Sequence, residues 1–205
     1  MAPWLSMVLI HALFATPVYV TELNRKLTSK ETNFKKIKQI KNYGNYKSND
    51  SYILNTKQFS NIKKELDIAI KDYFNKIISP KNKITPYITQ SWLNYTNTNE
   101  HHHKHNHPNS LVSGILYLNA NEKFDKVEFY RDDYNMIKPE IKNFNFFNSE
   151  SWWLPVKTGQ IMLFPSSLSH SVSIKKGTNN RVSLAFNVFI KGGVGSLNDL
   201  TRLVL

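Results

Sequence analysis

The second half of the chain consists of short segments in which apolar residues recur at every second position. Seven such segments lie at residues 84–95, 111–119, 126–131, 151–157, 160–164, 169–175 and 181–190. This alternation is typical of strands with one buried face, and turn residues separate several of the segments, as at residues 119–123 and 176–180. Because no helical pattern lies between them, the sequence predicts a mostly β fold, an antiparallel sandwich or barrel.

The first 84 residues carry a different pattern. The sequence predicts a buried strand at residues 12–22, after a ragged start, and a helix at about residues 56–78. The apolar residues of that helix form one stripe at helical spacing, namely Ile62, Leu66, Ala69, Ile70, Tyr73, Phe74 and Ile77. We therefore expect one domain over residues 1–205, with an N-terminal strand and supporting helices at residues 1–84 and the β core at residues 85–205.

The composition excludes several classes of protein. The 205 residues include no cysteine, so any metal must be held by His, Asp or Glu. With 40% hydrophobic and 13% aromatic residues, the chain is too apolar to be disordered. No apolar run is long enough to span a bilayer, and the start of the chain lacks the cationic region of a secretory signal. We therefore expect a cytoplasmic protein with no membrane partner.

The formal net charge is +12, from 27 Lys and Arg against 15 Asp and Glu. When such charge is clustered, it is typical of proteins that bind phosphate, nucleic acid or acidic partners. Here the charge is mostly Lys in an Asn-rich chain, a bias that often follows AT-rich coding DNA. The basic stretch at residues 26–47 is more typical of a solvated face than of a nucleic-acid site.

Five of the seven histidines fall within residues 101–107. In a strand, residues i and i+2 project from one face about 7 Å apart, so a His-x-His pair can close on one metal ion. The available pairs are His101/His103, His103/His105 and His105/His107, and His170 follows a separate strand. Three neutral imidazoles suit iron, zinc, copper or nickel. Alternatively, residues 101–107 form a solvated loop, and His170 is a polar residue whose hydrogen bonds are made within the protein.

Arg181 begins the last predicted strand. Alternation places it on one face with Ser183, toward a cavity that also holds His170, while the apolar face packs under the helices. A buried Arg needs an anionic partner, and a small-molecule carboxylate bound in bidentate fashion would serve, with Ser183 adding a hydroxyl hydrogen bond. The same alternation points the Tyr117 hydroxyl into the cavity. The alternatives are a surface position for Arg181 and an ordinary core position for Tyr117.

At these residues the sequence resembles the iron(II)- and 2-oxoglutarate-dependent oxygenases. It looks closest to the prolyl-hydroxylase-like branch and, within it, to a family of small oxygenases found in phages and marine bacteria. The matching blocks are residues 105–110, 112–119, 159–166 with His170, and 181–187, and residues 13–18 and 91–93 also look like the start of that family. The blocks span nearly the whole chain in the right order.

The resemblance implies a double-stranded β-helix, or jelly roll, so that residues 1–205 form one oxygenase domain with its jelly-roll core at residues 85–205. It implies that His105, His107 and His170 hold Fe(II). It also implies that Arg181 and Ser183, with Tyr117, bind the distal carboxylate of 2-oxoglutarate.

The implied reaction consumes 2-oxoglutarate and O₂, releases succinate and CO₂, and hydroxylates an unidentified substrate, which is a small molecule, a protein or a nucleic acid. The implied location is the cytoplasm of a bacterium or of a phage-infected host.

One ligand departs from the pattern of the superfamily, because His107 stands where a carboxylate is usual. The replacement removes one negative charge beside the metal, which should favour a dianionic co-substrate and make the site more accommodating to Zn, Ni or Cu. Two alternatives remain. A cupin-type metalloenzyme also uses His-x-His and a later His, but it expects a Glu near Leu111 and Val112. A basic, non-enzymatic jelly roll would bind metal or nucleic acid without 2-oxoglutarate.

Overall fold

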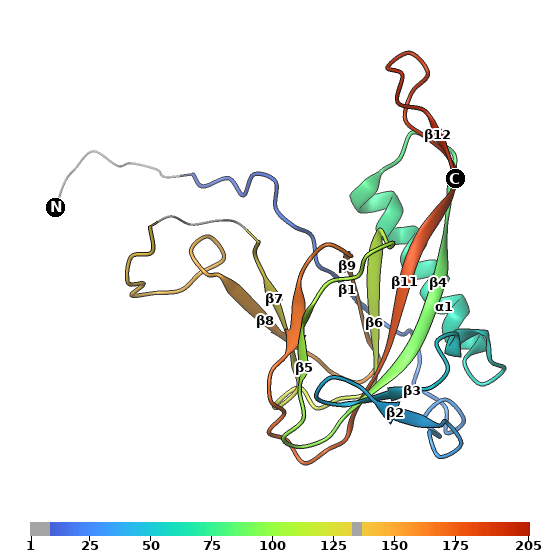
Figure 1. Ribbon diagram of the computed structural model, residues 1–205, viewed down its shortest axis with the longest axis vertical. Coiled ribbons are helices and arrows are strands. Elements are labelled where there is room, and N and C mark those ends of the chain that lie inside the picture. Colours follow the sequence, from blue (N-terminus) through green and yellow to red (C-terminus); the bar gives the residue numbers. More distant parts are fainter. Residues whose placement is uncertain (1–8, 133–136) are drawn as a thin grey trace.

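The computed structural model describes residues 9–132 and 137–205 (Figure 1). Two antiparallel sheets make up the body, and the helix α1 lies along the outer face of the larger sheet. The larger sheet has the strand order β1-β9-β6-β11-β4-β3-β2, with β12 paired to β11, and the smaller sheet has the order β5-β10-β7-β8. The predicted mostly β architecture is confirmed.

All seven strands predicted between residues 84 and 190 are present. The larger sheet contains β1 (Tyr19–Glu22), β2 (Gln39–Lys41), β3 (Tyr46–Ser48), β4 (Ile84–Thr96), β6 (Val112–Asn119), β9 (Gln160–Pro165), β11 (Arg181–Val194) and β12 (Leu203–Val204). The smaller sheet contains β5 (His102–His105), β7 (Lys126–Tyr130), β8 (Ser151–Pro155) and β10 (His170–Val172). The helical elements are η1 (Ile53–Asn55), α1 (Ser60–Tyr73) and the π-helical turn η2 (Phe74–Ile78) that continues it. The predicted helix is thereby confirmed.

Alternation along the strands sorts side chains between two cores. On the helix side, Leu66 of α1 packs with residues such as Leu116 of β6 and Leu184 of β11. Between the sheets, a second core consists of Tyr117, Val127, Phe129, Val156, Met162 and Phe164. The apolar face of β11 packs under the helix as predicted, so its other face is left for a polar cavity between the sheets.

The N-terminal strand is shorter and more exposed than predicted. β1 begins at Tyr19 rather than at residue 12, and residues 9–18 are irregular. Pro17 has no N–H to donate to a ladder, and Phe14, at a φ of 56°, is fully exposed. The prediction of a buried strand is therefore wrong for residues 12–18. The ragged start at residues 1–8 lies outside the described residues.

The Asn- and Phe-rich segment at residues 132–150 has no helix or strand where it is described, and residues 133–136 lie outside the described part. It exposes Phe144, Phe146 and Phe147. None of the helices in the described part of the chain is long and apolar enough to cross a membrane.

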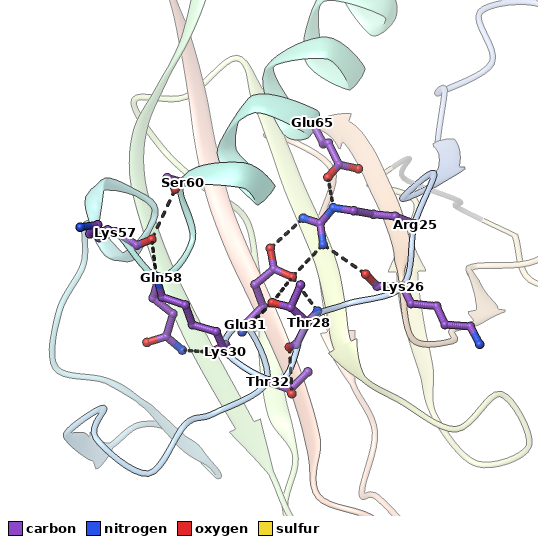
Figure 2. Close-up of polar contacts among 10 residues, drawn as sticks. All are labelled: Arg25, Lys26, Thr28, Lys30, Glu31, Thr32, Lys57, Gln58, Ser60 and Glu65. Atoms are coloured by element: carbon purple, nitrogen blue, oxygen red, sulfur yellow. Dashed lines mark hydrogen bonds and ion pairs between the residues drawn. The ribbon is translucent and has the colours of Figure 1, made fainter.

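Arg25 joins the loop after β1 to α1 and is held by the buried carboxylate of Glu31 (Figure 2). Arg25 donates from Nη1 and Nη2 to the two carboxylate oxygens of Glu31, at 2.8 and 2.7 Å, and from Nε to Glu65 of α1 at 2.7 Å. Thr28 donates its backbone N–H and its hydroxyl to Glu31, which is 2% exposed. The hydrogen bonds from Arg25 are the main cause that lowers the pKa of Glu31 from 4.5 to about 2.

We predict that Glu31 makes the stability of the protein sensitive to acid. Because its pKa is lower in the folded than in the unfolded chain, its stabilising effect is complete above pH 4.5 and is lost as the pH falls through about 2. Glu31→Gln should lower the free energy of unfolding at pH 7 by about 1–3 kcal/mol. It should also flatten the decline in stability between pH 4.5 and pH 2, measured by urea denaturation. Glu140→Gln, at an exposed residue, is the control, and an unchanged acid response in Glu31→Gln would contradict the prediction.

Gly114 of β6 lies against the ring of Phe186 on β11. The two residues are partners in the ladder, and a Cβ added at Gly114 would come within 2.1 Å of the Phe186 ring. Phe186 is buried in the helix-side core, so its ring has little room to move.

Overpacking therefore predicts that Gly114→Ala lowers the free energy of unfolding by about 1–3 kcal/mol, measured by chemical denaturation. The same substitution should cost less in a Phe186→Leu background, because the smaller side chain leaves room for the methyl group. An equal cost in both backgrounds would show that this ring is not the obstacle.

Candidate active site

A cavity between the two sheets contains every site residue predicted from the sequence. His105 and His170 come from the smaller sheet, while Tyr117, Arg181 and Ser183 come from β6 and β11 of the larger one. His107 follows β5, where its backbone N–H donates to the carbonyl oxygen of Ser166 at 3.0 Å. The predicted inward alternation of β6 and β11 is confirmed by this arrangement.

Three histidines converge at one end of the cavity. One ring nitrogen each from His105, His107 and His170 lies within 4.8 Å of the other two. His170 is directly opposite His105 in the β5–β10 ladder, and their ring centroids are 4.4 Å apart. The ring of His107 is 5.1 Å from that of His105 and 5.3 Å from that of His170. Imidazoles arranged in this way can hold one transition-metal ion.

Backbone carbonyl groups determine which nitrogen of two rings carries the proton. His105 Nδ1 lies 2.8 Å from the carbonyl oxygen of His103, and His170 Nδ1 lies 3.1 Å from that of Leu168. Because a carbonyl oxygen only accepts, each Nδ1 must be the donor, and the lone pair is left on Nε2. Metal-ligating histidines are usually oriented by such a bond from the other ring nitrogen.

Burial keeps the three imidazoles neutral. It is the largest cause that lowers the pKa of His170 to about 3 and that of His107 to about 4, and it also lowers the pKa of His105. A neutral imidazole can donate its lone pair to a metal at pH 7. The indole of Trp92 stacks on the His107 ring at a centroid distance of 5.6 Å and covers that side of the cluster.

Arg181 is a buried cation whose hydrogen-bonding capacity is only partly used. It is 3% exposed, and its Nη1 donates to the carbonyl oxygen of Lys126 at 3.2 Å. Its Nε has no hydrogen-bond partner among the residues that the structure describes. Burial lowers its pKa, and burial raises the pKa of Tyr117 to about 12, an effect that the charge of Arg181 opposes. A guanidinium with an unused donor in a buried cavity is suited to an anionic ligand.

The sequence does not predict the buried ion pair close to Arg181. Lys175 Nζ lies 3.5 Å from Asp125 Oδ1, and both side chains are 1% exposed. Lys175 also donates to Asn179 Oδ1, and Asn179 Nδ2 donates to Asp125 Oδ2. Asp125 directly precedes Lys126, so this network fixes the backbone that supplies the carbonyl group bound by Arg181.

Asp125→Asn should lower the free energy of unfolding by about 3–5 kcal/mol, because it leaves the Lys175 ammonium buried without a counter-charge. Chemical denaturation of the single variants and of Asp125→Asn/Lys175→Met measures the coupling between the two residues. We expect the double variant to lose less than the sum of the single losses. Strictly additive losses would mean that the two charges do not depend on each other.

A β-bulge brings a fourth histidine to the cavity. His105 pairs with His170 and His102 pairs with Val172, so three steps along β5 match two steps along β10. The extra residue puts His102 and His105 on the same side of the strand, with their rings stacked at 4.4 Å. Strict alternation would have separated them, and no signal in the sequence marks the bulge.

The fold and the cavity define a class of protein: a β sandwich with a three-histidine centre that shares a cavity with a buried arginine. Residues 90–187 match a family described as "Putative 2OG-Fe(II) oxygenase". The matched stretch is just under half of the chain and contains all six predicted site residues. By this match, residues 90–187 are similar to the 2OG-Fe(II) oxygenase family.

Solved structures of 2OG oxygenases have the same fold. HygX from Streptomyces hygroscopicus, solved with nickel and 2-oxoglutarate bound, is 10% identical, with a TM-score of 0.58 over 84% of this chain and 82% of HygX. A Pseudomonas putida prolyl-4-hydroxylase is 11% identical, with a TM-score of 0.53 over 84% of this chain and 92% of its own.

A 2OG-Fe(II) oxygenase family oxidoreductase from Burkholderia pseudomallei is 12% identical, with a TM-score of 0.54 over 75% and 72% of the two chains. No curated protein matches the chain. At these identities the likeness concerns the fold, and it confirms the predicted jelly roll.

Proposed function

We propose that the chain is a hydroxylase in which His105, His107 and His170 hold Fe(II), and in which Arg181 binds the distal carboxylate of 2-oxoglutarate. The observation that carries the proposal is the unused Nε of the buried Arg181, in the same cavity as three convergent imidazoles. Metal and arginine together match the two ends of a 2-oxo dicarboxylate, whose keto end binds metals and whose far end is an anion.

The donor set fits the proposed iron. Two of the three imidazoles present an Nε2 lone pair that a backbone hydrogen bond holds in place, and all three are neutral at pH 7. Imidazole is a suitable ligand for Fe(II), and three protein ligands leave coordination positions open. Because none of the three proposed ligands is a carboxylate, a dianionic co-substrate is favoured at this centre.

The chain's own residues hold the co-substrate and exclude water. Arg181 is aimed by its bond to the carbonyl oxygen of Lys126, and Ser183 lies two residues further along the same face of β11. Tyr117 keeps its proton, since its pKa is about 12, so its hydroxyl can donate to a carboxylate. When bound, the iron would supply the activation of O₂, one oxygen atom of which enters succinate, formed from 2-oxoglutarate with release of CO₂, and the other the hydroxylated substrate.

The cavity must widen to admit the co-substrate. Its volume is about 30 Å³, which holds no more than a few water molecules. Changes of side-chain rotamer are common on ligand binding, and Trp92 is only partly buried at its wall. We place the prime substrate beside Trp92, where the indole covers His107.

We predict that His170→Ala and Arg181→Ala each abolish 2-oxoglutarate turnover, measured as succinate formation with Fe(II) and O₂. Arg181→Ala should also raise the Kd for 2-oxoglutarate at least about 30-fold in anaerobic calorimetry, because a buried charge pair is lost. Arg202→Ala, at an exposed arginine, is the control. Full turnover in either site variant would overturn the proposal.

The same calorimetry separates the oxygenase from a cupin-type metalloenzyme. In a cupin-type enzyme, Arg181 would have no anionic ligand to bind. Lack of 2-oxoglutarate binding to the Fe(II)-loaded wild-type protein would therefore favour the cupin. Steep, salt-dependent DNA binding without 2-oxoglutarate binding would favour the basic, non-enzymatic jelly roll. A cytoplasmic location, in a bacterium or a phage-infected host, stays a prediction.

A further inference from the structure

Two of the clustered histidines have no role in the proposed reaction. His102 and His103 precede His105 on the bulged strand β5. The bulge stacks His102 on His105 at 4.4 Å, and the ring of His103 lies 5.0 Å from that of His105 and 5.2 Å from that of His102. One nitrogen from each of these three rings lies within 4.8 Å of the other two. They form a second cluster, the outer set, beside the inner set of His105, His107 and His170.

His105 belongs to both sets but has only one lone pair to give. Its Nδ1 carries the proton that is donated to the carbonyl oxygen of His103, so Nε2 is the single nitrogen available to a metal. A metal ion in the outer set therefore takes the same lone pair that the inner set requires. Occupation of the two sets is mutually exclusive as long as this hydrogen bond persists.

The outer set is accessible and has the chemistry of a transition-metal site. His103 is exposed, and its ring lies 5.1 Å from that of Tyr43. The other contact that a metal would replace is a long one, between Asn42 Nδ2 and His102 Nε2 at 3.5 Å. Three imidazoles without a carboxylate bind Zn²⁺ more tightly than Fe²⁺.

We propose that His102, His103 and His105 form a zinc site that competes with the iron site for His105. Zinc entering from solvent at His103 would withdraw His105 from His107 and His170 and leave the inner set with two ligands. As an inhibitory device this rests on the proposed function, whereas the zinc site itself rests only on the geometry of the histidines.

The test is Zn²⁺ binding to the full-length, metal-free protein, measured by competition with a chromophoric chelator. His107→Gln disables the inner set, His103→Gln disables the outer set, and His101→Gln, in neither set, is the matched control. Wild type, the control and each single variant should bind one zinc ion. The double variant His103→Gln/His107→Gln should bind zinc at least about 100-fold more weakly than His107→Gln, beyond the loss typical for second-shell changes.

Two results would overturn the proposal. Equal zinc affinity in His107→Gln and in the double variant would show that the outer set is not a site. Two zinc ions bound to wild type would show that His105 is not shared. His170→Gln disables the inner set in a second way and replaces His107→Gln if that variant fails to fold, as judged by circular dichroism. None of these measurements depends on turnover, so the zinc result could be interpreted even if the oxygenase proposal failed.

Discussion

The pairing of β11 with both β4 and β6 is the constraint on which the rest of the structure depends. β11 forms a nearly continuous ladder with each neighbour, and its alternate side chains point to opposite sides of the larger sheet. Every second side chain of β11 packs into the core under α1. The side chains between them, including Arg181 and Ser183, line the cavity. The same backbone therefore sets both the packing of the core and the position of the anion-binding group, and neither can shift alone.

Much of the fold and the candidate site could be predicted because both depend on local alternation. A strand with one buried face must repeat at every second residue, so β4, β6, β9 and β11 are visible in the sequence. The same rule assigns Tyr117, Arg181 and Ser183 to the cavity side. The absence of cysteine directs attention to histidine, and the order of the blocks along the chain supplies the resemblance to the oxygenases.

The features that could not be predicted depend on partners distant in the sequence. The bulge exists only in the register of β5 against β10, which no pattern within residues 102–105 encodes. Short strands such as β2 and β12 bury too little surface to require an alternation of apolar and polar residues in the sequence. The Lys175–Asp125 pair joins residues 50 positions apart, and a buried lysine resembles any other lysine in a chain this rich in them.

The bulge in β5 makes the length of this segment matter as much as its composition. With one residue fewer between His102 and His105, the two strands would pair one to one. His102 would stay opposite Val172 and on the same side as His105, whereas the single residue left between them would face the other side of the strand. A single-codon deletion here would therefore keep His102 and His105 on the cavity side but remove the position from which the His103 ring reaches both. Among related chains, the number of residues in this short stretch thus indicates whether a third imidazole can join that pair, which an inventory of ligand types would miss.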